Sequence, residues 1–388
     1  MPQEQSLSGQ SVSTDVQTPA EGTERLAGRV VIVGPVTPYR GGIAQHTSML
    51  CRALSRQCDL HVLSFSRQYP KLLFPGESDR DPDAAALELD QLEFRLDSIN
   101  PLSWARAGKH IRALAPDLVV IPWWTFFLAP CFGSIARSCR KHGIAVRFFC
   151  HNSADHEQSR WKSALVDWAL TRADAFIAQT RQDADNLQSA YPGKPVLMHP
   201  HPIYDQFPPA VEPPPRRASL ELLIFGLVRE YKGLDVLIEA LARLEHDDFM
   251  LTIAGEFWWG REQISARVAE LGLDSRVEIV PRYVSDEEAA NFFGRADAVI
   301  LPYRSATGSG VIPLAYHYGK PVVVTRTGGL PDVVVDGETG LIGPNAPKEL
   351  AAAIDALPEL LGTDVAGAIT ELKKSLTWEG LARTVRTL

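Results

Sequence analysis

Two basic side chains stand close together in the second half of the chain, between a strand-like run and a helical pattern. Arg229 and Lys232 belong to the stretch FGLVREYKG at residues 225–233. Two cations at the end of a strand could neutralise a pyrophosphate group as it leaves a reacting carbon. The alternative is a solvated loop that carries surface charges. We therefore treat Arg229 and Lys232 as candidate phosphate ligands.

A loop of small residues follows a later strand-like run and precedes another helical pattern. The loop reads PYRSATGSG at residues 302–310 and ends with Thr307, Gly308, Ser309 and Gly310. The first backbone amides of a helix have no partner within it, so such a loop can hold a diphosphate without side-chain charge. A merely flexible loop is the alternative.

A pair of glycines, Gly41 and Gly42, occupies the matching place in the first half, between the run at 29–33 and a helical pattern at 45–54. Glycine lets the backbone approach a ligand closely, and the amides of a helix start favour anions. The pair belongs neither to a GxGxxG motif nor to a Walker loop, so a plain turn is the alternative.

Two titratable side chains directly follow other strand-like runs. His151 begins the stretch HNSADHE at residues 151–157, and Glu256 follows the run at 250–254. Polar groups at the carboxyl ends of strands in an α/β sheet are placed to meet ligands. A structural histidine and a solvated carboxylate are the alternatives. The spacing matches no HExxH-type zinc motif, so no metal site is expected.

Short β-branched runs alternate with longer amphipathic stretches along the chain, which predicts βαβ units and parallel sheets. The predicted strands of the first half cover residues 29–33, 60–65, 118–121, 146–150, 175–178 and 196–198. Those of the second half cover residues 222–225, 250–254, 277–280, 298–301 and 321–325. Between the halves, residues 207–219 hold five prolines and no periodicity, which indicates a linker. The sequence therefore predicts an α/β protein with two doubly wound domains.

Composition narrows the function further. The 388 residues carry a formal net charge of −8, which argues against broad binding of nucleic acid. The five cysteines form no CxxC pair and suit a reducing compartment. The polar N-terminus has no apolar core of a secretory signal and is interpreted as a disordered tail. Residues 118–136 are 19 residues without a charge, but Pro122 and Pro130 favour a strand, a loop and a helix start over a membrane span.

In these motifs the chain resembles the large bacterial family of retaining glycosyltransferases with the GT-B fold, the group 1 or family 4 type. The resemblance runs from Arg29 to the C-terminus. It rests on several ordered motifs: GGI at 41–43, the strand-end His151, KGLD at 232–235, GKPVV at 319–323, GGLPD at 328–332 and DGETGL at 336–341. A subgroup with FGxxRxYKG, GEF, HNxxxHE and SATxSGV blocks is the most similar.

The resemblance implies two Rossmann-like domains that face a central cleft, with a nucleotide sugar bound between them. It implies that Gly42 approaches the diphosphate or the acceptor, that His151 contacts the donor sugar, and that Arg229 and Lys232 hold the phosphates. We take His151 and Gly42 as candidate catalytic residues. The candidate donor-binding residues are Gly41, Arg229, Lys232, Glu256, Thr307, Gly308, Ser309 and Gly310. Cationic side chains and helix amides serve in place of a metal in this family, so neither metal nor other cofactor is implied.

The chain departs from the family pattern at three places. The family carries two glutamates eight positions apart ahead of the GKP motif, and those places hold Ala306 and Leu314. The family arginine after the strand glycine is Leu227 here, with Arg229 two residues later. We interpret these departures as the subgroup's own version of the site. In this interpretation Arg229 replaces the shifted arginine, and hydroxyls of the 307–310 loop replace the glutamates.

The domain prediction divides the chain into five parts. These are a disordered tail at 1–27, an acceptor domain at 28–206, the linker at 207–219, a nucleotide-sugar domain at 220–365 and a C-terminal helix at 366–388 that packs back on the first domain. Trp378 in that last segment matches a habit of the family.

The expected function is that of a cytoplasmic retaining hexosyltransferase. It would use a UDP- or GDP-linked hexose and a saccharide or lipid-linked acceptor in bacterial polysaccharide or glycolipid biosynthesis. Two alternatives remain: a catalytically inactive sugar-nucleotide-binding assembly protein, favoured by the missing glutamates, and a sugar-nucleotide epimerase that uses the 151–157 cluster. Peripheral contact with the inner face of the plasma membrane is a further expectation, through the aromatic loop at 123–127 with Arg67, Lys71 and Arg80 nearby in sequence.

Overall fold

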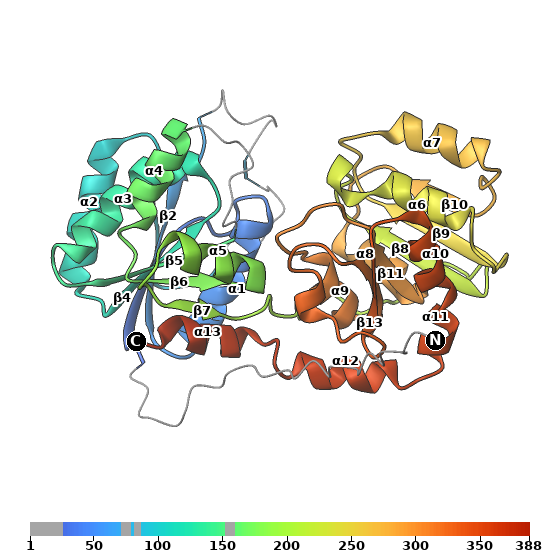
Figure 1. Ribbon diagram of the computed structural model, residues 1–388. Coiled ribbons are helices and arrows are strands. Elements are labelled where there is room, and N and C mark those ends of the chain that lie inside the picture. Colours follow the sequence, from blue (N-terminus) through green and yellow to red (C-terminus); the bar gives the residue numbers. More distant parts are fainter. Residues whose placement is uncertain (1–25, 71–78, 81–86, 152–159) are drawn as a thin grey trace, which may run out of the picture.

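The computed structural model describes residues 26–70, 79–80, 87–151 and 160–388. The predicted tail falls almost entirely outside these residues, as do Lys71 and the polar run that follows His151. Within the described residues the chain forms two parallel sheets, one in each half (Figure 1). Helices cover both sheets, so the predicted α/β class with two Rossmann-like domains is confirmed.

The N-terminal sheet is parallel throughout, in the order β3-β2-β1-β4-β5-β6-β7. Its central strands are buried on both faces, which explains their unbroken β-branched and aromatic runs. The strands are β1 (Arg29–Val33), β2 (Asp59–Arg67), β3 (Leu92–Asp97), β4 (Leu118–Trp123), β5 (Ala145–Cys150), β6 (Ala175–Ala178) and β7 (Val196–Met198).

Helices cover the two faces of this sheet unequally. Three consecutive helices, α2, α3 and α4, pack in turn over one face, and α1 packs on the other together with α13 from the chain's end (Figure 1). The helices are α1 (Gly42–Ser55), α2 (Pro101–Leu114), the 3-10 turn η2 (Phe126–Leu128), α3 (Ala129–Arg140), α4 (Arg160–Leu170) and α5 (Arg181–Ala190).

The C-terminal sheet has the order β10-β9-β8-β11-β12-β13 and is also parallel. The strands are β8 (Leu220–Phe225), β9 (Phe249–Ala254), β10 (Val277–Val280), β11 (Ala298–Leu301), β12 (Val322–Thr325) and β13 (Gly340–Gly343). The helices are η3 (Glu230–Lys232), α6 (Leu234–Leu241), α7 (Arg261–Glu270), α8 (Asp286–Arg295), α9 (Val311–His317), η4 (Pro331–Val333), α10 (Pro347–Asp355) and α11 (Leu357–Leu361).

The segment predicted as one C-terminal helix holds two. Helix α12 (Val365–Lys373) stays with the second half, and α13 (Trp378–Arg386) crosses to the first, where it contacts α1 and β7 (Figure 1). The break follows from local chemistry, because the Thr377 hydroxyl accepts a hydrogen bond from the Gly380 amide and so starts a new helix. Arg147, which is buried in β5, holds the other end of α13 by donating to the Val385 carbonyl.

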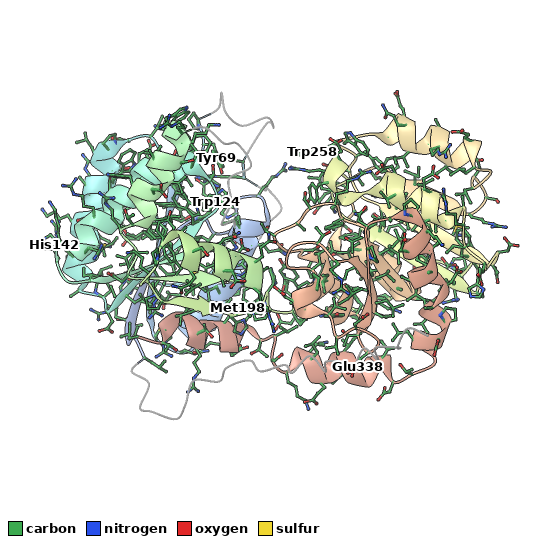
Figure 2. All side chains as sticks on the ribbon, viewed as in Figure 1. Tyr69, Trp124, His142, Met198, Trp258 and Glu338 are labelled. Atoms are coloured by element: carbon green, nitrogen blue, oxygen red, sulfur yellow. The ribbon has the colours of Figure 1, made fainter. Side chains whose placement is uncertain are left out.

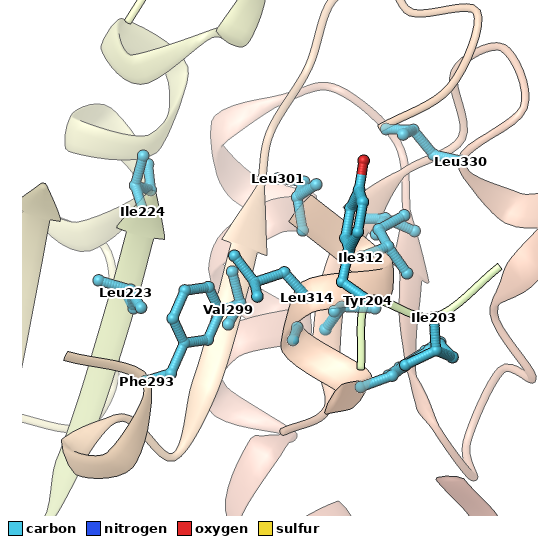
Figure 3. Close-up of a cluster of buried hydrophobic side chains, with 14 of the residues drawn as sticks. Ile203, Tyr204, Leu223, Ile224, Phe293, Val299, Leu301, Ile312, Leu314 and Leu330 are labelled. Atoms are coloured by element: carbon cyan, nitrogen blue, oxygen red, sulfur yellow. The ribbon is translucent and has the colours of Figure 1, made fainter. Parts of the chain in front are cut away.

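One hydrophobic cluster is continuous between the two halves. Ile203 and Tyr204, which follow β7, pack beside Ile312 and Leu314 of the second half (Figure 3). Trp378 of α13 joins the same cluster, and its indole N–H donates to the Ile203 carbonyl at 2.9 Å. The relative position of the two sheets is therefore fixed by apolar packing as well as by the chain.

The uncharged stretch at 118–136 forms a strand, a 3-10 turn and a helix start, as its prolines predicted. It divides into β4, η2 and the first part of α3. Across the part of the chain that the structure describes, no helix combines the length and the apolar character needed to span a bilayer.

The continuous cluster predicts a large effect of Trp378→Ala. Trp378 is 4% exposed and fills space between α1 and Tyr204. Its truncation leaves a cavity and an unpaired carbonyl, so we expect the free energy of unfolding to fall by about 3–5 kcal/mol in urea titration. The control is Trp161→Ala, because Trp161 is 62% exposed, and there we expect a loss below about 1 kcal/mol. Equal losses in the two variants would contradict the packing role of α13.

Candidate active site

The candidate residues lie where the sheet topology places ligands. In each sheet the strand order reverses at one point. This switch point lies between β1 and β4 in the first sheet and between β8 and β11 in the second. Loops that leave neighbouring strands there run to opposite faces and open a crevice at the carboxyl edge. The β1 loop leads to Gly41 and Gly42, the β8 loop to Lys232, and the β11 loop to Gly310.

Lys232 is a buried cation at the second of these points. Its side chain is about 5% exposed, its ammonium donates to the Phe225 carbonyl at 3.2 Å, and it lies 5.5 Å from the centre of the Tyr303 ring. Burial, with a smaller contribution from nearby Arg229, lowers the pKa of Lys232 to about 8. Among the described residues no carboxylate forms an ion pair with it. A buried ammonium whose partners among the described residues are one carbonyl and one aromatic ring could accept an anionic ligand.

Backbone contacts hold Lys232 against the β11 loop. Gly233 adopts a positive φ of 65°, and a Cβ there would meet the Pro302 carbonyl oxygen at 2.1 Å. The Arg304 amide donates to the Tyr231 carbonyl at 2.7 Å, and Arg304 forms an ion pair with Asp235 on α6. The glycine of the KGLD motif is therefore required by a close approach of two loops. That approach brings Lys232 beside the predicted diphosphate loop.

Arg229 lies near Lys232 but points to an aromatic partner. Its guanidinium stacks over the Trp258 ring at 4.8 Å, and the Trp258 indole N–H donates to a Glu256 carboxylate oxygen at 3.3 Å. Trp258 is exposed on the edge of the second domain that faces Tyr69 and Trp124 of the first (Figure 2). Arg229 and Glu256 thus belong to one exposed unit, whose cation is free to turn towards a ligand at the cost of one stacking contact.

The loop at 307–310 lies between the two domains. The Ser309 hydroxyl accepts a hydrogen bond from the Val311 amide at 3.2 Å and lies 3.5 Å from the Tyr303 hydroxyl, so Tyr303 links this loop to Lys232. Gly310, which precedes α9, lies against Tyr204, whose hydroxyl a Cβ at this glycine would meet at 3.4 Å. The structure therefore brings Lys232 and the 307–310 loop together.

The glycines of the GGLPD motif are explained by a contact between the domains. A Cβ on Gly329 would meet the Thr180 methyl group at 2.2 Å and the Thr307 carbonyl at 2.5 Å. Next to them, the Asp332 carboxylate accepts from the Arg181 amide at the start of α5, at 2.7 Å. Burial raises the pKa of Asp332, while the Arg181 amide lowers it. A carboxylate at a helix N-terminus closes the two domains on each other.

Gly41 and Gly42 begin α1 and border open space. Gly41 has a φ of 104°, which favours glycine, and a Cβ on either residue would meet no atom of the described residues within 4 Å. No described side chain caps this end of α1. The first amides of a 14-residue helix therefore face a space that could admit an anion.

His151 lies one step away from α1, within a cluster of imidazole rings. Its ring centre is 4.7 Å from that of His46 on α1, and His46 is 5.1 Å from His201. Gln179, after β6, lies 3.0 Å from a His46 ring nitrogen. Contacts thus run from the 307–310 loop through Tyr204, His201 and His46 to His151.

The cluster is held in its neutral form. Burial lowers the pKa of His151 to about 3 and that of His201 to about 4, and it lowers the pKa of His46 well below its usual value. The neighbouring rings reinforce the effect on His46, since one imidazolium disfavours a second. His201 hydrogen-bonds the Pro202 carbonyl through Nδ1 and the Tyr204 hydroxyl through Nε2, so Nδ1 donates and Nε2 accepts.

Sequence reasoning missed most of this cluster. His46, Gln179 and His201 come from three separate segments, and their proximity depends on the sheet order. The repeated His-Pro pattern at 199–202 is the one local signal that could have pointed to it. Within the described part of the chain, no group of three or more His, Cys, Asp or Glu side chains is arranged to hold a metal ion.

At the two positions where the family carries glutamates, this chain has residues that pack closely against their neighbours. Leu314 is 4% exposed and lies in the apolar cluster beside Val299 (Figure 3). Ala306 turns its carbonyl towards Gly328, where a Cβ would collide with it. A carboxylate at position 314 would be buried among apolar side chains, so the change to leucine belongs to the core of this chain.

Two sequence families match the chain, one in each half. The family described as "Glycosyl transferase 4-like domain" matches residues 41–203, and the one described as "Glycosyl transferases group 1" matches residues 219–359. A curated relative, D-inositol 3-phosphate glycosyltransferase 1 of Catenulispora acidiphila, is 31% identical over 225 residues. That match covers 53% of each protein, so the chain spans about half the length of this relative.

Solved glycosyltransferases share the fold over nearly the whole chain. A glycosyltransferase from Rickettsia africae superposes with a TM-score of 0.67 at 18% identity, covering 92% of this chain and 96% of its own. HepE of Anabaena, solved in complex with UDP, superposes with a TM-score of 0.66 at 16% identity, covering 92% and 98%. The same protein has also been solved with UDP-glucose. At these identities the likeness establishes the GT-B fold alone.

The histidine cluster predicts a pH dependence of stability. A histidine in the unfolded chain has a pKa near 6.5, whereas that of His201 is lowered to about 4. Between these values only the unfolded state binds the proton, so this contribution is complete above about pH 6.5 and is lost as the pH falls. We expect the unfolding free energy to fall between about pH 7 and about pH 5 in both proteins. In urea titration the fall should be about 2 kcal/mol smaller for His201→Gln than for wild type.

The control for this prediction is the exposed His246, changed to Gln. We expect its unfolding free energy to run parallel to that of wild type over the same pH range. A parallel curve for His201→Gln as well would show that the cluster does not stay neutral in the folded protein.

Proposed function

Because the chain belongs to the group 1 and family 4 glycosyltransferases, we propose that it transfers a hexose from a nucleotide-diphosphate sugar to a saccharide or lipid-linked acceptor, with retention at the sugar carbon. The donor would be a UDP- or GDP-linked hexose, and the pathway that of a bacterial polysaccharide or glycolipid. One relative is named D-inositol 3-phosphate glycosyltransferase 1, so we include a phosphorylated cyclitol in the acceptor screen.

The observation that carries this proposal is the buried ammonium of Lys232. A lysine at 5% exposure, with its pKa lowered to about 8 and no carboxylate paired to it among the described residues, is prepared for an anion. It sits at the carboxyl edge of the second sheet, where a bound nucleotide would place its phosphates. Lys232 would stabilise the negative charge that develops on the leaving diphosphate.

The other residues take supporting roles in this proposal. Arg229 would turn from Trp258 to the phosphates, and the 307–310 loop would receive the β-phosphate and the sugar. His151, held neutral, would donate a hydrogen bond to the donor sugar without bringing a charge. The open start of α1 at Gly41 and Gly42 would meet the diphosphate or the acceptor from the facing domain. With these donors the reaction needs no metal ion.

One observation favours the alternative of a binding protein without transferase activity. Leu314 occupies a glutamate position of the family and is part of the core. In that alternative the chain binds a nucleotide sugar tightly and neither transfers the sugar nor hydrolyses the donor. Measured turnover with any hexose donor would exclude it.

We propose Lys232→Met as the test of the donor site. A thermal-shift screen of UDP, GDP and ADP first identifies the nucleotide. Loss of a charge-assisted hydrogen bond should then weaken its binding by about ten- to a hundredfold in calorimetry. Wild-type binding should also weaken above about pH 8, where the free lysine loses its proton, while binding by the variant stays flat.

The matched control for Lys232→Met is Lys320→Met. Lys320 also belongs to the second domain, and its ammonium also donates to a backbone carbonyl, that of Gly294 at 3.3 Å. We expect nucleotide binding by this variant to equal that of wild type. An equal loss in both variants, or none in either, would remove Lys232 from the proposed site.

We also propose a peripheral membrane contact, and we place it at Trp161 rather than at the predicted loop of residues 123–127. Trp123 is 4% exposed and Phe127 stacks on Tyr69, so neither is offered to lipid. On α4, Trp161 is 62% exposed and packs edge-on to Phe126. Aromatic side chains on an amphipathic surface insert at the headgroup level of a bilayer.

Flotation with vesicles of phosphatidylcholine and phosphatidylglycerol tests this contact. We expect wild-type protein to float, and Trp161→Ser to lose at least about half of the bound fraction, because a buried aromatic ring contributes a few kcal/mol. Val211→Ser is the control, since Val211 is 79% exposed on the linker. Absence of wild-type flotation would end this part of the proposal.

A further inference from the structure

A second basic site lies on the first domain, at the opposite edge of its sheet from the candidate active site. The C-terminal ends of α3 and α4 converge there, just before β5 and β6 begin. Arg137, Arg140, Lys141, Thr171 and Arg172 line an open cup of about 470 Å³. His142, next to Lys141, marks this outer side of the domain, away from the second domain (Figure 2).

Contacts within the protein balance part of the positive charge in the cup. Arg140 forms an ion pair with Asp174 at 3.2 Å, and Arg172 bonds the Trp168 carbonyl while it stacks on that ring at 4.2 Å. Lys194 donates to the carbonyls of Thr171, at 2.9 Å, and of Ala173. Cations at the C-terminal ends of helices are stabilised by the helix dipoles.

That explanation does not account for all of the charge. The two helix ends supply about half an elementary charge each, and Asp174 supplies one more. With Lys194 the cup carries five cations, so a surplus of about three positive charges remains. The chain as a whole has a net charge of −8, so this concentration does not follow from composition.

Arg137 and Lys141 carry the unexplained part of the surplus. Arg137 lies in the last turn of α3 and Lys141 is its C-cap, four residues later on the same side, where like charges destabilise each other. Neither side chain forms an ion pair with any of the described residues. Arg137 and Arg140 also act on Arg172, whose pKa is lowered by burial and then by these two neighbours.

We infer that this cup binds a soluble phosphorylated compound, at a site distinct from the proposed donor site. The planar donors of guanidinium groups match phosphate oxygens in pairs, whereas the Thr171 hydroxyl already donates to the Asp167 carbonyl at 2.7 Å. A doubly or triply charged phosphate offsets the surplus that the helix ends leave. Occupancy of the cup would relieve the repulsion among Arg137, Lys141 and Arg172.

A phosphate in solution is favoured over a lipid headgroup by the position of the cup. Trp161 begins α4, and the cup lies at the other end of that helix, about 15 Å away along its axis. The cup lining consists of charged and hydroxyl side chains, with no apolar side chain to enter a bilayer. A headgroup site next to a membrane surface is expected to include such a side chain.

Pyrophosphate binding to the full chain tests the inference, in a background that carries Lys232→Met so that the donor site is weakened. Calorimetry should detect one binding event, and Arg137→Ser with Lys141→Ser should weaken it by about tenfold or more. The control pair is Lys109→Ser with Lys348→Ser, which removes the same charge from exposed positions elsewhere. The control should bind pyrophosphate as the parent does.

Three results would overturn the inference. Absence of pyrophosphate binding to the parent is the first, and equal weakening in the cup pair and the control pair is the second. The third is a protein that does not bind pyrophosphate but floats with phosphatidylglycerol vesicles, and that stops floating in the Arg137→Ser, Lys141→Ser pair. That result would assign the cup to a lipid headgroup. Retained helical circular dichroism in both pairs would show that the comparison concerns binding and not folding.

Discussion

The burial of one ammonium group, that of Lys232, is the interaction on which the proposed site depends. Taking a charge out of water is costly unless an anion or several hydrogen bonds replace the lost hydration. Lys232 has one carbonyl bond and one aromatic face, and its pKa is lowered to about 8. The close approach of Gly233 to the Pro302 carbonyl brings this group beside the β11 loop. In the proposed function, a phosphate of the nucleotide supplies the anion that this buried ammonium needs.

The first domain prepares its side of the site by excluding charge. Three imidazoles, a buried one on α1 and partly buried ones after β5 and after β7, have lowered pKa values, and ring contacts connect them to Tyr204 and the loop of the second domain. Two of these rings, His46 and His201, also contact Trp378 of α13, the helix that crosses over from the second domain. The apolar cluster that joins the domains and the polar surface of the candidate site therefore share side chains and contact each other directly.

The sequence predicted the fold well where local pattern and burial agree. All eleven predicted strands appear within a few residues of their places, because buried parallel strands need apolar runs. It missed β3, a strand at the edge of the sheet with exposed charged residues, and β13, which is four residues long with a glycine at each end. Neither carries the apolar run that made the others visible.

The sequence predicted individual residues of the candidate site, but it did not predict which of them contact each other. Lys232 and the 307–310 loop follow from strand ends, but the stacking of Arg229 on Trp258 and the imidazole contacts depend on packing between distant segments. The loss of a family glutamate at Leu314 is explained only by its place in the core.

The most direct test of this account is a crystal structure of the full chain with the nucleoside diphosphate that binds it. The account predicts a phosphate oxygen within hydrogen-bond distance of the Lys232 ammonium, with the 307–310 loop on the other side of the same phosphate. A nucleotide bound with its phosphates away from Lys232, and the ammonium still enclosed by Phe225 and Tyr303, would contradict it.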